Sequence, residues 1–335
     1  MLLNNDLSWS DPWLSYARPH RTGYPFAPAW AFASDKKWEG IFRICEKGLR
    51  NSVHETFVDC PYYEQMQYVG DTRVQALTWL AITGDVRPVQ RALELFDRSR
   101  WFNGFVAERC PSSPVQMSAT YSLIQPLMLR DFCYWANEPA VVKRLLTGTR
   151  CALENAVACL DDTGLPSNLP GWLFVDWVKT HGWGGGNPLG DEPVLSAPVA
   201  LHLPLGLQAA AEVEALVGDA QIAARWREMA AAVLERIFKT YWNSEYKILA
   251  DNREHSKFSE HAQALALACD GVPGDYRRGM EAGLINSPVE LARASVYFSF
   301  YVHDALLRSR QADAVIDRFA FWDHLEAQGF LTTVE

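Results

Sequence analysis

The longest regular pattern in the chain covers residues 195–241, which read LSAPVALHLPLGLQAAAEVEALVGDAQIAARWREMAAAVLERIFKTY. Its first part, residues 195–217, is strongly apolar but contains two prolines, His202 and Gln208, which indicates a buried helix rather than a membrane span. Gly218 and Asp219 form a turn signal, and residues 220–241 continue as a second helix. We predict a helical hairpin for this stretch.

The same type of pattern recurs on both sides of this hairpin. After an irregular lead-in over residues 1–33, a helix starts at Ser34 and carries apolar residues on one face as far as Leu49. Further helices are predicted at 72–83, 86–99, 119–135, 139–160, 259–269, 275–283, 289–308 and 311–326, which makes about eleven in all. No run of alternating residues predicts a strand.

Helices on short links form either an open solenoid or a closed ring of hairpins. A solenoid shows a fixed repeat of ~34–47 residues, and none is present. Irregular segments at 51–70, 101–117 and 161–194 instead alternate with helix pairs. This alternation favours an all-α (α/α)6 toroid over residues 34–335, with a cleft built by loops at one end. Twelve helices close such a ring, so we expect the final helix to lie beyond a truncated C-terminus.

Composition narrows the possible functions. The chain has 335 residues, 49% of them apolar, and a formal net charge of −9 without a run of Lys or Arg, which argues against nucleic acid and anionic membrane surfaces as partners. Seven scattered cysteines form no CxxC pair, so we expect buried reduced thiols, no metal site and no cofactor. The N-terminus has no signal-peptide pattern, which favours the cytoplasm and leaves the compartment open. Thirteen Trp, 12 Tyr and 16 Phe in an acidic chain suit a carbohydrate partner.

The densest cluster of chemical groups lies at residues 59–71, which read DCPYYEQMQYVGD. It holds three carboxylates and three tyrosines without a basic residue. Glycoside hydrolysis needs one carboxylic acid to protonate the leaving oxygen and a second carboxylate to activate water or attack carbon. An aromatic loop and neighbouring like charges would favour the protonated form of Glu64. The alternative is structural, with Asp71 as a helix N-cap and Asp59 capping a turn before Pro61.

Two further segments are candidates for the same site. Residues 172–177 read WLFVDW and mix tryptophans with an acid, as a sugar subsite does, although a loop packed by its own tryptophans is the alternative. The C-terminal residues 329–335 read GFLTTVE and end on a carboxylate, Glu335, which has no meaning in isolation.

These segments together resemble the family 78 glycoside hydrolases, the α-L-rhamnosidases, which are inverting enzymes with an (α/α)6 catalytic domain. The resemblance rests on the helix start at Ser34-Asp35, the 59–71 loop, residues 174–177, the helix at 259–263 and the residues 329–335. It implies that Glu64 is the general acid and Glu335 the general base. It also implies that Asp59 and Asp71 hold sugar hydroxyls and that Asp176 and Trp177 line the site, where Trp177, Trp172 and Tyr68 stack on the sugar.

The chain departs from the common family pattern in two ways. Tyr62-Tyr63 and Tyr68 stand where many members have Arg-Asp and Trp, which affects the identity of the sugar more than the chemistry. The β-domains and the last part of the barrel found in members of the family are not present, so we expect weak or no activity from residues 1–335 alone. Two alternatives stay open: another (α/α)6 enzyme, of the glucuronyl hydrolase or glucoamylase type, and a sugar-binding remnant without catalysis.

Overall fold

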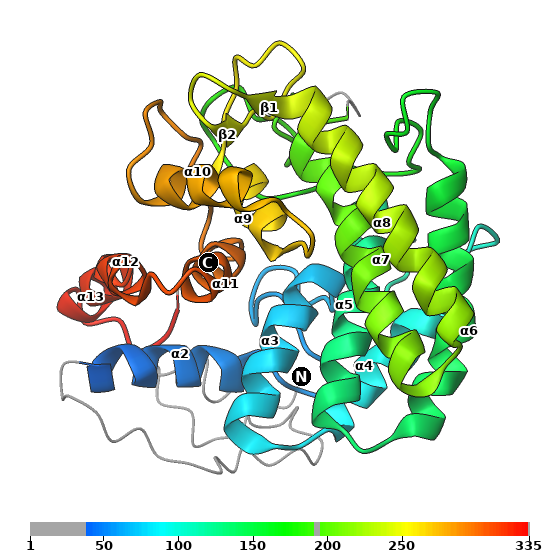
Figure 1. Cartoon of the computed structure of the whole chain (residues 1–335). Coiled ribbons are helices and arrows are strands. Elements are labelled where there is room, and N and C mark those ends of the chain that lie inside the picture. Colours follow the sequence, from blue (N-terminus) through cyan, green and yellow to red (C-terminus); the bar gives the residue numbers. More distant parts are fainter. Residues whose placement is uncertain (1–37, 191–194, 334–335) are drawn as a thin grey trace, which may run out of the picture.

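The computed structural model describes residues 38–190 and 195–333, which form mainly helices joined by loops (Figure 1). The helices are α2 (Glu39–Asn51), α3 (Val69–Thr83), α4 (Arg87–Arg98), α5 (Ala119–Trp135), α6 (Pro139–Ala158), α7 (Ala197–Val217), α8 (Ala220–Tyr241), α9 (Glu260–Ala268), α10 (Gly274–Ile285), α11 (Ser299–Arg308), α12 (Ala312–Asp317) and α13 (Ala320–Ala327). None of the helices in these residues is both long enough and apolar enough to cross a membrane.

The predicted hairpin at 195–241 is confirmed as α7 and α8. Side chains of α7 are buried around most of its circumference, from Ala197 to Glu214, because both sides of this helix pack against other helices. Helix α8 buries one stripe that includes Trp226, Ile237 and Tyr241, as expected for a helix with one face in water. The helix that is buried on most of its sides is therefore an inner element and the amphipathic helix an outer one.

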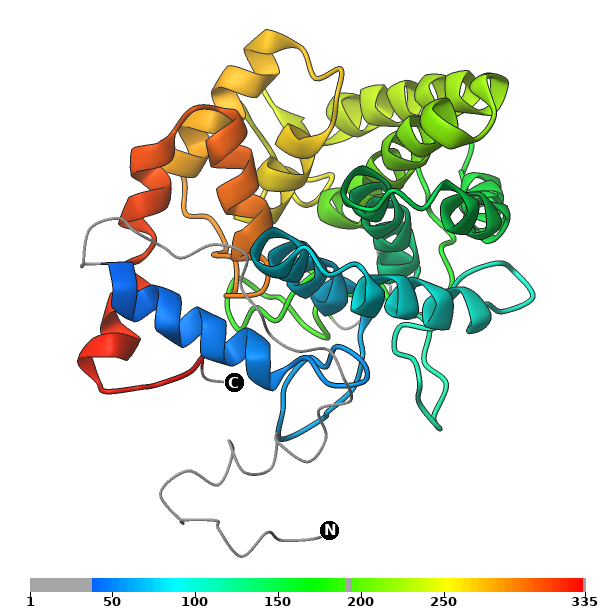
Figure 2. The same ribbon diagram turned by 90° about the horizontal axis from the view of Figure 1, so that it is seen from below.

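The other helices repeat this arrangement in a ring. Helices α3, α5, α7, α9 and α11 contact one another in that order. Helices α4, α6 and α10 each pack against the members of this inner set that precede and follow them in the chain, and α8 packs against α7. Helix α13 packs against α2, and the Trp38 and Phe319 rings meet edge to face at 5.5 Å. Figure 2 shows the C-terminal helices returning to α2. The helical toroid predicted from the sequence is thus confirmed.

Three inner helices begin at a buried serine. The side chains of Ser118, Ser196 and Ser259 accept hydrogen bonds from backbone N–H groups in the first turns of α5, α7 and α9. Each serine satisfies a donor that would otherwise be buried without a partner. Ser259 lies at the predicted start of the helix 259–269 and is the N-cap of α9.

Several predicted elements differ from the structure. The predicted helix 289–308 is helical only from Ser299, because the N–H groups of Ala294 and Ser295 bind the carboxylates of Glu260 and Asp176 instead of helix carbonyls. The predicted helix 311–326 is divided into α12 and α13. A short antiparallel pair, β1 (Trp242–Asn243) with β2 (Ile248–Leu249), was not expected. The predicted start at Ser34 lies outside the described residues.

All seven cysteines are free thiols, as predicted. Their expected burial holds fully only for Cys269, while Cys151 is exposed and the other five are half-buried. Burial raises the pKa of the Cys45 and Cys60 thiols to about 11, which keeps both protonated and unreactive at neutral pH.

Candidate active site

A small pocket lies where α3 and α5 begin. It has a volume of about 100 Å³. Most of the residues singled out from the sequence line it, together with four that were not. The full lining is Asp59, Glu64, Tyr68, Asp71, Glu108, Tyr121, Trp172, Phe174, Trp177 and Tyr297. Three segments that are far apart in the sequence, 59–71, 172–177 and the residues before α11, therefore meet in one place.

The loop that carries Glu64 is closed by Asp59. The Asp59 Oδ1 atom accepts a hydrogen bond from Met66 N at 2.9 Å, and the backbone N–H of Asp59 donates to Met66 O at 2.8 Å. Burial raises the pKa of Asp59, although hydrogen bonds from Met66 and Cys60 oppose the rise. The expected turn-forming role of Asp59 is thus real, and its carboxylate also lines the pocket.

Glu64 is exposed at the mouth of the pocket. The Tyr68 hydroxyl donates a short hydrogen bond to its Oε2 atom and accepts another from Arg109 Nη1 at 2.9 Å. The Arg109 guanidinium also lies over the Tyr68 ring, 5.7 Å from its centre. Arg109 and Tyr68 therefore hold the Glu64 carboxylate in one orientation. The aromatic loop does not enclose Glu64, whereas the pocket residue Glu108 is buried.

Asp71 lies in the first turn of α3 and is not its N-cap, a position that Tyr68 occupies without a side-chain hydrogen bond. The structural alternative for Asp71 is therefore wrong. Its Oδ2 atom accepts a hydrogen bond from the Tyr121 hydroxyl at 3.4 Å. Burial and the negative charge of Asp59 raise the pKa of Asp71 to about 7. The preceding Gly70 leaves the space that the Tyr121 ring and the Tyr297 hydroxyl occupy, since a Cβ atom there would lie 2.4 Å from the Tyr297 oxygen.

Aromatic rings form the opposite wall of the pocket. The ring centres of Trp172, Phe174 and Trp177 lie 4.9–5.6 Å from one another. Trp172 is held by a hydrogen bond from its Nε1 to Gly185 O at 2.6 Å, whereas the Trp177 side chain is 63% exposed. Gly186 has a φ of 76° and a Cβ atom there would lie 2.2 Å from the Phe174 ring, so the wall requires glycine at this position.

Asp176 is not in the pocket lining, in contrast to its predicted contact with the sugar. It is fully buried. Its carboxylate accepts hydrogen bonds from His261 Nε2 at 2.7 Å, from Ser295 N at 2.8 Å, from the Ser295 hydroxyl and from Trp177 N at 2.9 Å. With every direction of approach occupied by a protein donor, the carboxylate holds the aromatic loop against α9 and against the segment before α11.

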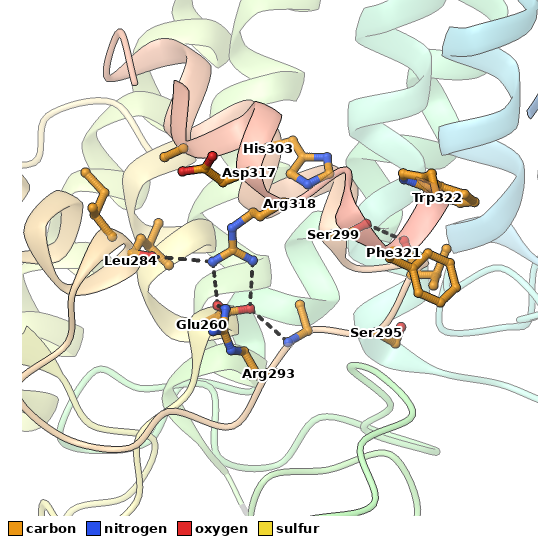
Figure 3. A pocket seen from close by; sticks show the side chains of 14 residues that line it. Glu260, Leu284, Arg293, Ser295, Ser299, His303, Asp317, Arg318, Phe321 and Trp322 are labelled. Atoms are coloured by element: carbon orange, nitrogen blue, oxygen red, sulfur yellow. Dashed lines mark hydrogen bonds and ion pairs between the residues drawn. The ribbon is translucent and has the colours of Figure 1, made fainter. Parts of the chain in front are cut away.

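A second acid fixes that same segment from the other side. Figure 3 shows Arg293 and Arg318 pointing at Glu260, in the wall of a separate cavity of about 450 Å³. Arg318 Nη2 lies 2.6 Å from Glu260 Oε1, and Ala294 N donates to Oε2 at 3.0 Å. Burial opposes the ionisation of Glu260, but Arg318, the Ala294 N–H group and Arg293 together outweigh it and hold the pKa below its usual range. Glu260 and Asp176 therefore anchor adjacent residues, Ala294 and Ser295, two residues before the pocket residue Tyr297.

The pocket residues that were not singled out individually are Glu108, Tyr121, Phe174 and Tyr297, although Phe174 lies in the quoted segment 172–177. Arg109, which binds the Tyr68 hydroxyl, was also missed. A signal for Glu108 is present in the sequence, since a Glu-Arg pair follows the apolar run 105–107, which is buried in the structure. The two tyrosines gave no signal, because each lies in a helical pattern that also fits a core position. Among the described residues, no group of three or more His, Cys, Asp or Glu side chains is placed to hold a metal ion.

Glu335, the predicted general base, lies outside the described residues. The last described residue, Thr333, packs directly over Gly48 of α2, where a Cβ atom would lie 2.6 Å from the Thr333 hydroxyl. The C-terminal segment is therefore attached to the helix that leads into the loop of Asp59 and Glu64.

Comparison with known proteins assigns most of the chain to one family. A family model described as the bacterial alpha-L-rhamnosidase 6 hairpin glycosidase domain matches residues 29–307. No curated protein matches the chain.

Solved structures of rhamnosidases share the fold. A family GH78 rhamnosidase of Bacillus sp. GL1 superposes with a TM-score of 0.84 at 22% identity, over 93% of this chain and 33% of its own. A rhamnosidase from Klebsiella oxytoca with rhamnose bound gives 0.79 at 21% identity, over 91% of this chain and 58% of its own. An α-L-rhamnosidase from Aspergillus terreus gives a TM-score of 0.72 at 13% identity, over 90% of this chain and 36% of its own. This chain thus spans between a third and somewhat over half the length of these proteins.

Proposed function

Because the chain belongs to the family of bacterial α-L-rhamnosidase six-hairpin glycosidase domains, we propose that it hydrolyses a terminal α-L-rhamnoside with inversion at the anomeric carbon. The observation that carries this proposal is the pocket at the start of α3, which joins Asp59, Glu64 and Asp71 to an aromatic wall. Carboxyl groups supply the acid and base of glycoside hydrolysis, and aromatic faces bind the apolar side of a sugar ring.

Glu64 is the general acid of the proposed reaction. It lies at the mouth of the pocket, where a leaving group can depart into solvent, and protonates the glycosidic oxygen. As the proton leaves, negative charge develops on the carboxylate. The Tyr68 hydroxyl, itself hydrogen-bonded to Arg109, already points at that carboxylate and stabilises the charge without rearrangement.

Glu335 is the proposed general base, carried over from the resemblance of residues 329–335 to the family. It removes a proton from a water molecule on the face of the sugar opposite to Glu64. Inversion requires room for this water, so we expect roughly 6.5–9.5 Å between the two carboxyl groups.

The remaining pocket residues bind the sugar. Asp59 and Asp71 accept hydrogen bonds from hydroxyls, and their charge stabilises the oxocarbenium-like transition state. Trp172, Trp177 and Tyr68 offer apolar surface to the ring and to the methyl group that rhamnose carries at C5. The rhamnose bound in the Klebsiella oxytoca protein supports this choice of sugar, as does the fold that the two chains share.

The test uses the full natural polypeptide that contains residues 1–335. We expect it to cleave p-nitrophenyl α-L-rhamnoside in preference to the corresponding glucosides and glucuronides, and to release β-L-rhamnose first in a proton NMR time course. Glu64→Gln should reduce cleavage by at least 1,000-fold, an order of magnitude set by the loss of acid catalysis, and should still bind L-rhamnose. Glu55→Gln, at an exposed glutamate in the preceding loop, is the control.

Each alternative has its own outcome. Preferential cleavage of the glycoside of another sugar would leave Glu64 as the proposed general acid and replace rhamnose as the proposed sugar. Sugar binding without turnover of any glycoside would favour a non-catalytic binding protein. Release of α-L-rhamnose first would refute inversion.

A further inference from the structure

Glu108 is a fourth acid in the pocket, and the proposed reaction does not use it. The residue follows a buried apolar run and precedes Arg109. Its backbone is held on both sides, because Glu108 N donates to Gln116 O at 2.8 Å and Glu108 O accepts from Val69 N at 3.0 Å. Val69 is the first residue of α3, the helix that carries Asp71. The start of α3 therefore positions both Asp71, which it carries, and Glu108, whose backbone it binds.

The carboxyl group of Glu108 has an unused oxygen. Only 1% of the residue is exposed, its side chain lines the pocket, and its Oε2 atom is buried without a hydrogen-bond partner in the part of the chain that the structure describes. Its neighbour Arg109 is directed at the Tyr68 hydroxyl and forms no ion pair with Glu108 among the described residues. A buried polar atom without a partner is unfavourable, and each such atom in a native protein calls for an explanation, such as a catalytic role or a bound water or ligand.

The other three acids already have protein partners. Glu64 accepts from Tyr68, Asp59 accepts from Met66, and Asp71 accepts from Tyr121. Glu108 is thus the acid in this pocket for which a bound molecule would supply a missing partner. A sugar hydroxyl has the chemistry to do so, since it both donates and accepts hydrogen bonds.

The surroundings of Glu108 favour its neutral form. Burial raises the pKa of Glu108 to about 7, and the charges of Asp71 and Glu64 add to the effect while Arg109 opposes it. The groups that face it from other elements are acids or phenols: Glu64 and Tyr68 from the 59–68 loop, Asp71 from α3 and Tyr121 from α5. In its neutral form the carboxyl carries a proton that it can donate to an acceptor in the pocket.

We propose that Glu108 is a sugar-binding residue of this pocket that donates a hydrogen bond from its neutral carboxyl to a ring hydroxyl of the substrate. This inference rests on the proposed function, because it needs a sugar in the pocket. The deeply placed Glu108 acts on the sugar itself, whereas Glu64 at the mouth acts on the bond to the leaving group. Glu108 thereby selects for a sugar with a hydroxyl at the position it reaches.

The experiment compares Glu108→Ala with Glu108→Gln by calorimetric titration with L-rhamnose near pH 6, with the unfolding temperature as a second measurement. Glutamine matches the neutral acid in shape and keeps a donor, so we expect it to bind L-rhamnose within about threefold of the unaltered protein. Alanine removes the donor, so we expect at least tenfold weaker binding. Neither variant should unfold at a lower temperature, since the lost oxygen has no protein partner. Glu138→Ala, at an exposed glutamate, is the control.

The possible outcomes separate the two proposals. Unchanged binding in Glu108→Ala would overturn the role of Glu108 and leave the proposed function intact. Equal loss in both variants would overturn the neutral donor, since glutamine keeps a donor and an acceptor and lacks only the negative charge of an ionised carboxylate. A lower unfolding temperature with unchanged affinity would show a purely structural residue. Failure of the unaltered protein to bind L-rhamnose would refute the proposed sugar, and this inference with it.

Discussion

Replacement of Asp176 by asparagine tests whether the pocket depends on a buried anchor behind it. The carboxylate accepts four hydrogen bonds, from His261, Trp177 and two atoms of Ser295, and is fully buried. Asparagine has the same shape, but only one of its terminal atoms accepts, and its amide group would face N–H or O–H donors. Each buried donor left unpaired costs about 1–3 kcal/mol. Two such losses, or the loss of the charge beside His261, give a decrease of about 3–5 kcal/mol in the free energy of unfolding.

Urea unfolding followed by tryptophan fluorescence measures this free energy by linear extrapolation. The matched control is Asp162→Asn at an exposed turn residue, which should change it by less than about 0.5 kcal/mol. Ser295→Ala removes one donor and leaves the carboxylate, so an intermediate loss of about 1–2 kcal/mol is expected. A loss below about 1 kcal/mol for Asp176→Asn would refute the reasoning, since it would mean that the four hydrogen bonds contribute nothing net. Weaker binding of L-rhamnose should accompany the loss, because Trp177 and Tyr297 follow anchored residues.

Three further changes test other parts of the site. Tyr68→Phe should lower kcat by about tenfold with little change in KM, because a hydrogen bond worth about 1.4 kcal/mol to the Glu64 carboxylate is lost; an equal rise in KM would argue against this role. Gly186→Ala should lower the free energy of unfolding by about 2 kcal/mol or more in urea, since its Cβ would meet the Phe174 ring and its φ is positive. Glu108→Gln should stabilise the protein more at pH 8 than at pH 5. A buried acid with its pKa raised to about 7 contributes stability that is present below the ordinary pKa of glutamate and is lost as pH rises through 7. At about 1.4 kcal/mol for each pH unit, the difference between the two urea series should be about 2–3 kcal/mol, and a pH-independent difference would contradict it.

The helices follow from local properties of the chain. The stretch 195–241 predicts its own hairpin, since α7 is strongly apolar, α8 is amphipathic and Gly218-Asp219 breaks the helical pattern between them. The loop at 59–71 likewise shows its acids as neighbours in sequence. The spacing of apolar residues, the turn residues and the grouping of acids all involve residues only a few positions apart. The sequence therefore predicts these features directly.

Local rules fail where a distant side chain competes for the backbone. Residues 289–298 have a helical pattern, yet the N–H groups of Ala294 and Ser295 bind carboxylates that lie about 30 and 120 positions earlier in the chain. The predicted sugar contact of Asp176 differs from the structure for the same reason, because the donors that surround it come from α9 and from the segment before α11.

The sequence by itself therefore determined the all-α class, the helical hairpins and the acidic loop with its aromatic partner segment. Tertiary structure alone decided which acids face the pocket, since this depends on burial and on contacts across the ring. It placed Glu64 at the exposed mouth, enclosed the Glu108 Oε2 atom without a hydrogen-bond partner among the described residues and set Asp176 behind the wall. The physical reason is that the protonation state of a carboxyl group and its available hydrogen bonds depend on the groups around it in space. Its neighbours in the sequence do not determine either.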